Sequence, residues 1–346
     1  MSARLGPERV GKTPVRRTLV CYAYHETPYA QNNLQFFVDV LRTQPWVDHV
    51  DYVFVVQGGK CSVKLPRHAR VRRLDRENVG YDFGAHAAIL ESTDLEAYTH
   101  FMFLNSSVCG PFLPKYTRDH FTDLFTRLLV GNVKLVGSAL ACRPDTDPGG
   151  AGPRIEGFCF ATDRVGLDVL RHPGTVFQQH PDKLSAVVEG EYGISRIMLN
   201  AGYNLDTLMF RYPSGRDWRQ KQHWKCNQCE FPTRDHTNDG VSLHPLETVF
   251  HKTFWQSLDN AVMPMEARRY RQWYRKKHGL PWPKCEEHRG VRNAEKHGAP
   301  LAVSRAPRAA WMIYVPVIVA CVVLGGLMLA LWWTNRPAPL PWAGGV

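Results

Sequence analysis

The stretch YTHFMFLNSSVCGPF, residues 98–112, decides the fold that this sequence predicts. It contains a short apolar run, residues 100–104, followed by small polar residues, a glycine and a proline. Apolar and aromatic residues bounded by turn residues are typical of a buried strand that ends in a loop. The residues on either side of this strand indicate what kind of sheet it belongs to.

Further runs of this kind predict strands at residues 18–24, 50–56, 71–74, 134–140 and 157–161. Between the first two, Leu34, Phe37 and Leu41 share one helical face. Strands that alternate with helices predict an α/β fold, with a mostly parallel sheet covered by helices on both faces. Ligands of such sheets bind at the carboxyl ends of the strands, here residues 24–27, 57–59, 76–84 and 105–114.

The segment RENVGYDFGA, residues 76–85, has glycines at 80 and 84 between a predicted strand and a predicted helix. Glycine lets a backbone approach a ligand closely, and a helix N-terminus offers free N–H groups to an anion such as a diphosphate. On spacing alone, a tight turn needed for packing is the more common explanation of two such glycines.

Three motifs together resemble a known family: ENVGYDFGA (77–85), FLNSSVCGPF (103–112) and SRIMLNAGYN (195–204). Their order resembles the nucleotide-sugar domain of family-2-type GT-A glycosyltransferases, and most closely a rhamnan-synthesis-like group of them. The resemblance covers residues 17–255. It implies a GT-A-like, Rossmann-like domain at residues 17–260 that transfers a sugar, a hexose or deoxyhexose, from a nucleotide-sugar donor to an acceptor hydroxyl.

The resemblance also implies a set of donor-binding residues, which are Tyr24, Glu26, Asn78, Gly80, Asp82, Gly84, Asn105, Ser107 and Lys252. The general base of such an enzyme deprotonates the acceptor hydroxyl. Glu191 falls at the matching place, with Glu189 as the fallback, and two nearby carboxylates raise one another's pKa. The alternative is that both glutamates are solvated residues of a helix N-terminus, where Glu is favoured.

At the position where the family carries a D-x-D triplet, this chain has Asn105-Ser106-Ser107, which provides no carboxylate for a metal. Mn²⁺ and Mg²⁺ prefer anionic oxygen ligands. We expect one of three situations: Asp82, with His251, binds a divalent ion; the diphosphate is neutralised without metal; or activity is lost.

A second metal hypothesis concerns zinc. Cys226 and Cys229 form a CxxC whose spacing suits structural zinc, although a second matching pair is missing. The alternative is a loop with two free thiols. The sequence predicts free thiols for all nine cysteines if the domain is cytosolic.

The net charge of +11 is concentrated near the C-terminus, where residues 266–308 hold twelve Lys/Arg against four Asp/Glu. Residues 309–335 then carry no charge, which predicts a transmembrane helix at 309–334. The positive residues before it predict a single-pass, tail-anchored membrane protein of an endomembrane or the plasma membrane, with its large domain in the cytosol. The remaining parts are a flexible basic arm (1–16), a basic linker (261–308) and a Pro-rich tail (335–346).

Within the linker, residues 263–277 predict an amphipathic helix with one apolar and aromatic stripe. Such a helix either lies on anionic lipid or packs its stripe on the domain. Because the positive charges adjoin the predicted span, we do not expect nucleic-acid binding.

Two functions follow. The first is a membrane-anchored glycosyltransferase with a glycan or lipid-linked acceptor. The alternative is a catalytically silent GT-A-like protein that binds a sugar nucleotide or glycan as a scaffold.

Overall fold

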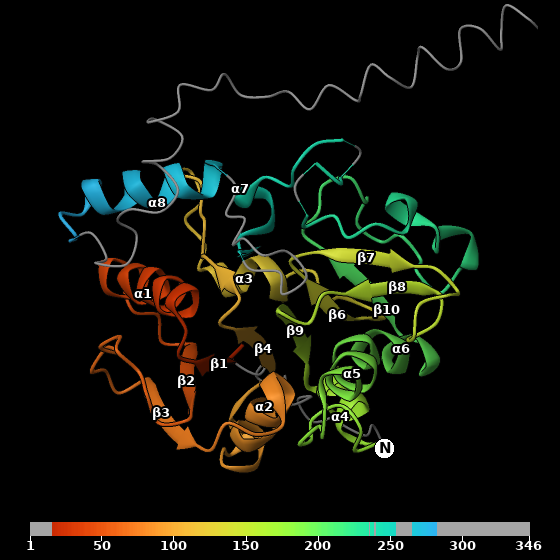
Figure 1. The fold of residues 1–346 in the computed structure, drawn as a ribbon, viewed down its shortest axis with the longest axis horizontal. Coiled ribbons are helices and arrows are strands. Elements are labelled where there is room, and N and C mark those ends of the chain that lie inside the picture. The colour runs from red at the N-terminus through yellow and green to blue at the C-terminus, as the bar shows by residue number, and fades with distance from the viewer. Residues whose placement is uncertain (1–15, 235, 239, 254–264, 282–346) are drawn as a thin grey trace, which may run out of the picture. The chain divides into compact units, whose positions relative to one another are not determined.

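The computed structural model describes residues 16–234, 236–238, 240–253 and 265–281, all of which belong to one compact unit, Met1–Glu286 (Figure 1). In this described part, seven strands form a central sheet in the order β10-β6-β9-β4-β1-β2-β3. The strands are β1 (Thr18–His25), β2 (Val50–Gln57), β3 (Val71–Arg76), β4 (His100–Asn105), β6 (Val133–Gly137), β9 (Cys159–Asp163) and β10 (Asn204–Thr207).

The central sheet is mostly parallel, as the alternation of strands and helices predicts. Strands β1, β2, β3 and β4 run parallel to one another, and so do β6 and β10. Strand β9 is antiparallel to both of its neighbours, β4 and β6. The four carboxyl ends of β1 to β4 therefore meet at one edge, and the beginning of β9 lies at that same edge.

Two short antiparallel pairs accompany the central sheet. Strand β5 (Val108–Cys109) pairs with β11 (His251–Lys252), and β7 (Leu140–Arg143) pairs with β8 (Gly152–Ile155). The run 134–140, predicted as one strand, is divided between β6 and β7. The chain leaves the central sheet after Gly137, and Leu140 then pairs with Ile155 of β8.

Helices lie on both faces of the sheet (Figure 1). They are α1 (Pro28–Thr43), α2 (Tyr81–Glu91), α3 (Phe121–Thr126), α4 (Arg164–Arg171), α5 (Lys183–Ser185), α6 (Tyr192–Asn200), α7 (Pro245–Thr248) and α8 (Met265–Lys277). Local chemistry explains where α1 begins: the Thr27 hydroxyl accepts from the N–H of Ala30, and Pro28 occupies the first turn, where its missing N–H costs nothing.

The core is built from side chains that alternate between the two faces of each strand. Tyr22 of β1 and Phe54 of β2 are paired in register, and both rings contact Phe37 of α1. On the other face, Phe103 of β4 lies against Phe160 of β9 and His86 of α2. Because both faces are covered there, β1 and β2 are buried along nearly their whole length.

Helix α8 packs on the domain with the stripe that was predicted to be apolar (Figure 1). Ala267 and Tyr274 are buried against Phe36 of α1 and Phe112, and the Tyr274 hydroxyl lies 2.5 Å from the Thr43 hydroxyl. Arg275 is also buried and forms an ion pair with Asp39 of α1 at 3.1 Å. Most of the stripe, Ala267, Tyr270 and Tyr274, therefore packs on the domain, which is the second of the two arrangements predicted for this helix, and contact with lipid is not supported. Met263 lies outside the described residues.

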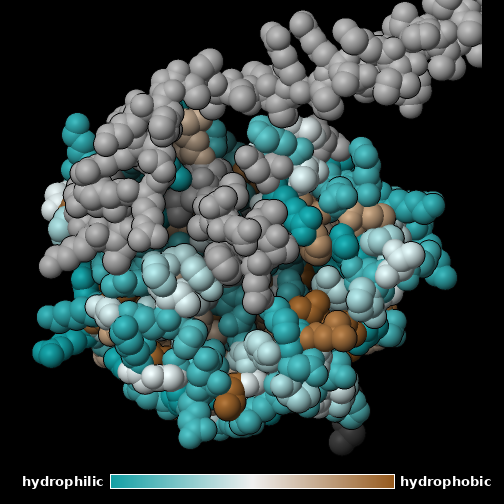
Figure 2. All heavy atoms as spheres, in the orientation of Figure 1, coloured by the Kyte–Doolittle hydropathy of each residue, from teal (hydrophilic) through white to brown (hydrophobic). Residues whose placement is uncertain are grey.

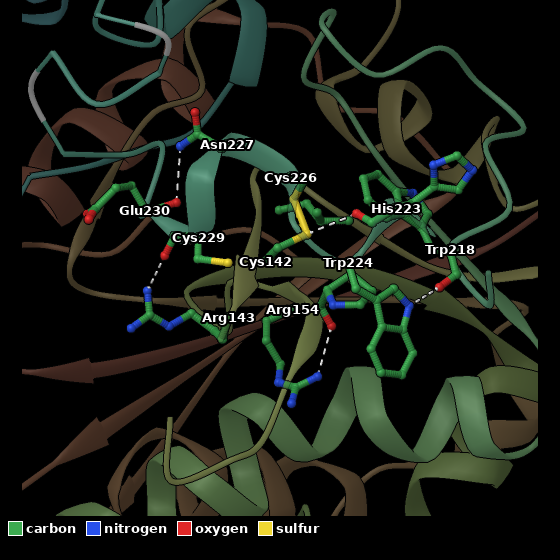
Figure 3. Close-up of a disulfide and its surroundings, with 12 residues drawn as sticks. Cys142, Arg143, Arg154, Trp218, His223, Trp224, Cys226, Asn227, Cys229 and Glu230 are labelled. Carbon is green, nitrogen blue, oxygen red and sulfur yellow. Dashed lines mark hydrogen bonds between the residues drawn. A yellow bond between two sulfur atoms is a disulfide. The ribbon is translucent and has the colours of Figure 1, made fainter. Parts of the chain in front are cut away.

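A disulfide joins Cys142, at the end of β7, to Cys226 (Figure 3). The Cα atoms lie 5.3 Å apart, and Arg143 Nη1 donates to the carbonyl oxygen of Cys229 at 2.6 Å. A sulfur in a disulfide cannot be a thiolate ligand. The predictions of a zinc at Cys226 and Cys229, and of free thiols throughout, are therefore wrong.

The predicted span 309–334 and the tail 335–346 lie outside the described residues. Among the residues that are described, no helix is both long and apolar enough to cross a membrane. In the view of Figure 2, the coloured surface is hydrophilic over most of its area, with separate hydrophobic patches.

Candidate functional site

Asp82 and Asn105 form the centre of the candidate site, at the carboxyl end of β4. Asn105 is the last residue of β4, and Asp82 lies in the first turn of α2. Asn105 Nδ2 donates a hydrogen bond of 2.8 Å to Asp82 Oδ2. Two residues that the sequence analysis proposed for the donor site are thus in direct contact, although 23 positions separate them.

The triplet Asn105-Ser106-Ser107 is held in place from both sides. Asn105 Oδ1 accepts from the backbone N–H and from the hydroxyl of Ser107, at 3.0 and 2.6 Å. Asn33 of α1 donates to the Ser106 carbonyl oxygen at 3.0 Å, and the Thr253 N–H donates to the Ser107 carbonyl oxygen at 2.9 Å. Both ends of the Asn105 amide therefore have a defined role: its nitrogen donates and its oxygen accepts.

Glu191 reaches the same edge of the sheet from the end of the π-helical turn Ala186–Glu191. Its Oε1 accepts from the Gly157 N–H at 3.3 Å. A Cβ atom on Gly157 would lie 2.8 Å from Glu191 Cγ, so glycine is required for this close approach. The next residue, Phe158, accepts at its carbonyl oxygen from the Asn105 N–H at 3.1 Å. The segment Gly157–Phe158 thereby connects the proposed base to the triplet.

Two lysines add positive charge to this group. Lys252 of β11 places its Nζ 5.4 Å from the centre of the Phe158 ring, and Lys183 of α5 lies 5.8 Å from the Tyr81 ring. Burial raises the pKa of the Asp82 carboxyl above its ordinary value, and the charge of Glu191 adds to the shift. Lys183, the hydrogen bond from Asn105 and Lys252 all oppose that shift.

The two glycines of the 76–85 segment contact protein rather than empty space. Gly80 has φ +73°, and a Cβ there would lie 2.6 Å from the Gln179 Cα. At Gly84 a Cβ would lie 3.2 Å from the Arg76 side chain. The packing explanation therefore accounts for both glycines in this structure, and their predicted role in donor binding stays a prediction.

Tyr24 and Glu26 lie at the end of β1, where they were expected. Tyr24 donates to Glu26 Oε2 at 2.6 Å, and the Ser62 N–H donates to the same oxygen at 3.0 Å. Burial tends to raise the pKa of Glu26, but the hydrogen bonds from Ser62 and Tyr24 outweigh burial and lower it. Asn78 is exposed, and its Cβ lies 3.7 Å from where a Cβ on Gly58 would be.

Glu189, the fallback base, is engaged elsewhere. Its Oε2 accepts from Gln178 Nε2 at 3.1 Å and from the Ser185 hydroxyl at 3.3 Å, and it lies 3.9 Å from His180 Nδ1. Glu191 accepts from the backbone N–H of Gly157 in the site. Glu189 instead accepts from Gln178 and Ser185, which lie outside it. The geometry therefore favours Glu191 over Glu189 as the base.

A divalent ion lacks a set of ligands here. Residues 16–234, 236–238, 240–253 and 265–281 contain no group of three or more His, Cys, Asp or Glu side chains that could hold a metal. His251 is buried in β11, opposite Cys109 of β5. The Asp82 carboxylate is bonded to an amide, and the neighbouring triplet brings no second carboxylate. The side chains of the described residues therefore do not fit the metal site expected from the resemblance to GT-A glycosyltransferases.

The sequence analysis missed Glu156 and Lys183. Glu156 is 2% exposed, and its Oε1 accepts from the Thr233 hydroxyl at 2.9 Å. The sequence does mark Glu156, because it is a single acidic residue directly before the apolar run 157–161. Lys183 carries no such signal, because it approaches Asp82 through tertiary structure alone.

Comparisons with known proteins come from structure alone, since no family model and no curated protein matches the chain. A mannosyltransferase from Pyrobaculum calidifontis, solved with GDP-Man and Mn²⁺, is similar at TM-score 0.37 and 15% identity, over 96% of this chain and 92% of that one. The glycosyltransferase GlyE of Streptococcus pneumoniae is similar at TM-score 0.35 and 14% identity, over 77% and 65%.

The catalytic domain of Drosophila β1,4-galactosyltransferase 7, solved with xylobiose, is similar at TM-score 0.32 and 8% identity, over 60% of this chain and 73% of that one. All three TM-scores are below 0.5, so these likenesses establish neither a shared fold nor a shared activity.

Proposed function

We propose that the domain is a glycosyltransferase that moves a sugar from a nucleotide-sugar donor to an acceptor hydroxyl. The observation that carries the proposal is the group formed by Asp82, Asn105 and Glu191 at the carboxyl ends of the strands, with Lys183 and Lys252 beside it. A carboxylate can accept the proton of a hydroxyl, and nearby ammonium groups can offset the charge of a departing diphosphate. This combination suits the transfer of a sugar from a nucleoside diphosphate.

In the proposed reaction, Glu191 takes the proton of the acceptor hydroxyl as that oxygen forms a bond to the anomeric carbon. The bond between this carbon and the phosphate oxygen breaks, and its electron pair stays on the nucleoside diphosphate. Lys183 and Lys252 would offset the negative charge that develops on the leaving group. Asn105 and Ser107 would position the diphosphate end, and no step requires a metal ligand from the protein.

The alternative, a silent scaffold that binds a sugar nucleotide or glycan, is favoured by one specific observation. The side-chain nitrogen and oxygen of Asn105 both already form hydrogen bonds within the protein, and the triplet contributes no carboxylate. A protein of that kind would bind the donor without transferring the sugar.

The test is a binding and turnover screen on the whole protein in detergent. UDP-glucose, GDP-mannose and dTDP-rhamnose are each titrated by calorimetry, with and without Mn²⁺, and release of the nucleoside diphosphate is followed in the presence of mixed glycan and lipid acceptors. Binding with turnover supports the transferase, and binding without turnover on any acceptor supports the scaffold. If no donor binds, the transferase and a scaffold for sugar nucleotides are both contradicted, and only a scaffold that binds a glycan is left.

We further propose that residues 309–334 anchor the protein in a membrane and that the acceptor is a glycan or a lipid-linked sugar. The uncharged run supports the anchor. The basic residues before it favour a cytosolic domain, whereas the Cys142–Cys226 disulfide favours an oxidising compartment. Carbonate extraction tests the anchor, and protease protection of residues 17–260 in intact vesicles decides the orientation.

A further inference from the structure

Glu156 is a buried carboxyl that the proposed reaction does not use. It lies between β8 and β9, its N–H donates to the Ala139 carbonyl oxygen at 3.1 Å, and its side chain is 2% exposed. Both carboxyl oxygens lie within 3.1 Å of the Thr233 hydroxyl. A hydroxyl has one proton to donate, so this neutral partner satisfies the carboxyl only in part.

Glu156 immediately precedes the two residues that join the site together. Gly157 donates its N–H to Glu191, and Phe158 accepts from the Asn105 N–H and carries Lys252 over its ring. The carboxyl of Glu156 is therefore fixed to a segment that contacts the proposed base, the triplet and a lysine. The carboxyl of Glu156 also interacts electrostatically with Glu191 and Lys252, two residues of the proposed site.

The groups that face Glu156 come from three elements. They are Lys252 of β11, Glu191 of the π-helical turn, and Thr233 and Arg234 of the loop after Cys229. Burial raises the pKa of Glu156 to about 7, and Glu191 adds to the rise, whereas Lys252, Thr233 and Arg234 oppose it. The carboxyl thus changes between its neutral and ionised forms near neutral pH.

We propose that Glu156 takes up a proton when the diphosphate of a nucleotide sugar enters the site, so that donor binding and protonation are coupled. This inference rests on the proposed function. An ionised Glu156 repels the incoming phosphates and competes with them for Lys252, and a proton on its carboxyl removes both effects. The proton partly replaces the charge compensation that a metal supplies in proteins with a carboxylate triplet.

The sign of the pH dependence follows from this coupling. A bound dianion disfavours the carboxylate, so the pKa of Glu156 is higher in the complex than in the free protein. Donor binding is therefore strongest below pH 7 and weakens as the pH rises through that value. Between pH 6.5 and 8.5 we expect the Kd to increase about tenfold.

The experiment is calorimetry at pH 8 in two buffers of different ionisation enthalpy, using whichever of UDP-glucose, GDP-mannose and dTDP-rhamnose binds. Their diphosphates are esterified at both ends and do not titrate near neutral pH. We expect the native protein to take up most of one proton for each donor molecule bound. In Glu156→Gln this uptake should be absent. The control is Asp206→Asn, another buried carboxyl, which is held by the backbone N–H of Thr207.

A second variant keeps the test decisive if Glu156→Gln does not fold. Thr233→Val removes the hydroxyl that favours the ionised form, so the pH at which binding weakens should move upward. Unchanged proton uptake in Glu156→Gln, or an unchanged pH profile in Thr233→Val, overturns this inference but not the proposed function. Failure of the native protein to bind any of the three donors overturns the proposed function, and this inference with it.

Discussion

Asn105 Nδ2 lies 2.8 Å from Asp82 Oδ2, and this hydrogen bond joins the end of β4 to the first turn of α2. It lies at the position where the sequence resemblance to GT-A glycosyltransferases predicts a D-x-D triplet. An amide in that place stabilises Asp82 as an acceptor and holds it against the triplet, whereas a carboxylate would repel it.

Asn105→Asp should convert the hydrogen bond into a contact between two carboxyls. The pKa of one of them rises, the added negative charge opposes the diphosphate, and donor affinity without divalent ion falls at least tenfold. Mn²⁺ should restore much of the loss, since two neighbouring carboxylates bind a hard cation. Calorimetry with and without Mn²⁺ measures this. The control is Asn200→Asp, an exposed asparagine at the end of α6, and equal affinity in Asn105→Asp and native protein would contradict the assignment.

Glu191→Gln should retain donor binding and lose sugar transfer by roughly 10²–10⁴-fold, because the amide cannot accept the acceptor's proton. Donor Kd and the rate of sugar transfer are measured on the same preparation. Glu189→Gln is the matched comparison, since it changes the other carboxyl of the same turn, which is bound to Gln178 and Ser185. A larger loss in Glu189→Gln than in Glu191→Gln would make Glu189 the base.

Cys142→Ser should lower the free energy of unfolding by about 4 kcal/mol, because the disulfide closes a loop across a separation of 84 residues. Denaturant unfolding without reductant measures the effect, and Cys226→Ser should give the same value. The control is Cys229→Ser, whose thiol is free. Equal stability of all three variants, or a peptide map that pairs Cys226 with Cys229, would contradict the assigned pairing.

Gly80→Ala should destabilise the domain by about 2 kcal/mol or more, because the new Cβ meets the Gln179 Cα at 2.6 Å and the backbone has φ +73°. Gly174→Ala separates the two causes. Gly174 has φ +69° but no atom within 4 Å of a Cβ, so it should lose only about 1 kcal/mol. Thermal unfolding of both variants measures the difference, and equal losses would mean that contact with Gln179 is unimportant.

Much of the central fold can be predicted from the sequence, because apolar periodicity is a local property. Strands β1, β2 and β4 fall where the apolar runs lie, and α1 begins at its Thr27-Pro28 start signal. Strand β8 contains Pro153, and β10 contains the polar residues Asn204 and Asp206, so neither has the composition of a strand. Pairing with β7 and β6 is what makes these residues strands.

The sequence by itself determined the α/β class and the polar ends of the strands, and its resemblance to a family suggested roles for Asp82, Asn105 and Glu191 that stay predictions. Only the tertiary structure decided which of these residues meet, that Cys226 pairs with Cys142 instead of Cys229, and that the stripe of α8 faces α1. The same applies to Glu156, whose chemistry depends on Thr233 and Lys252, 77 and 96 positions away along the chain. The physical reason is that periodicity and turn chemistry act between near neighbours, whereas burial, charge and pairing depend on distances in space that the folded chain alone sets.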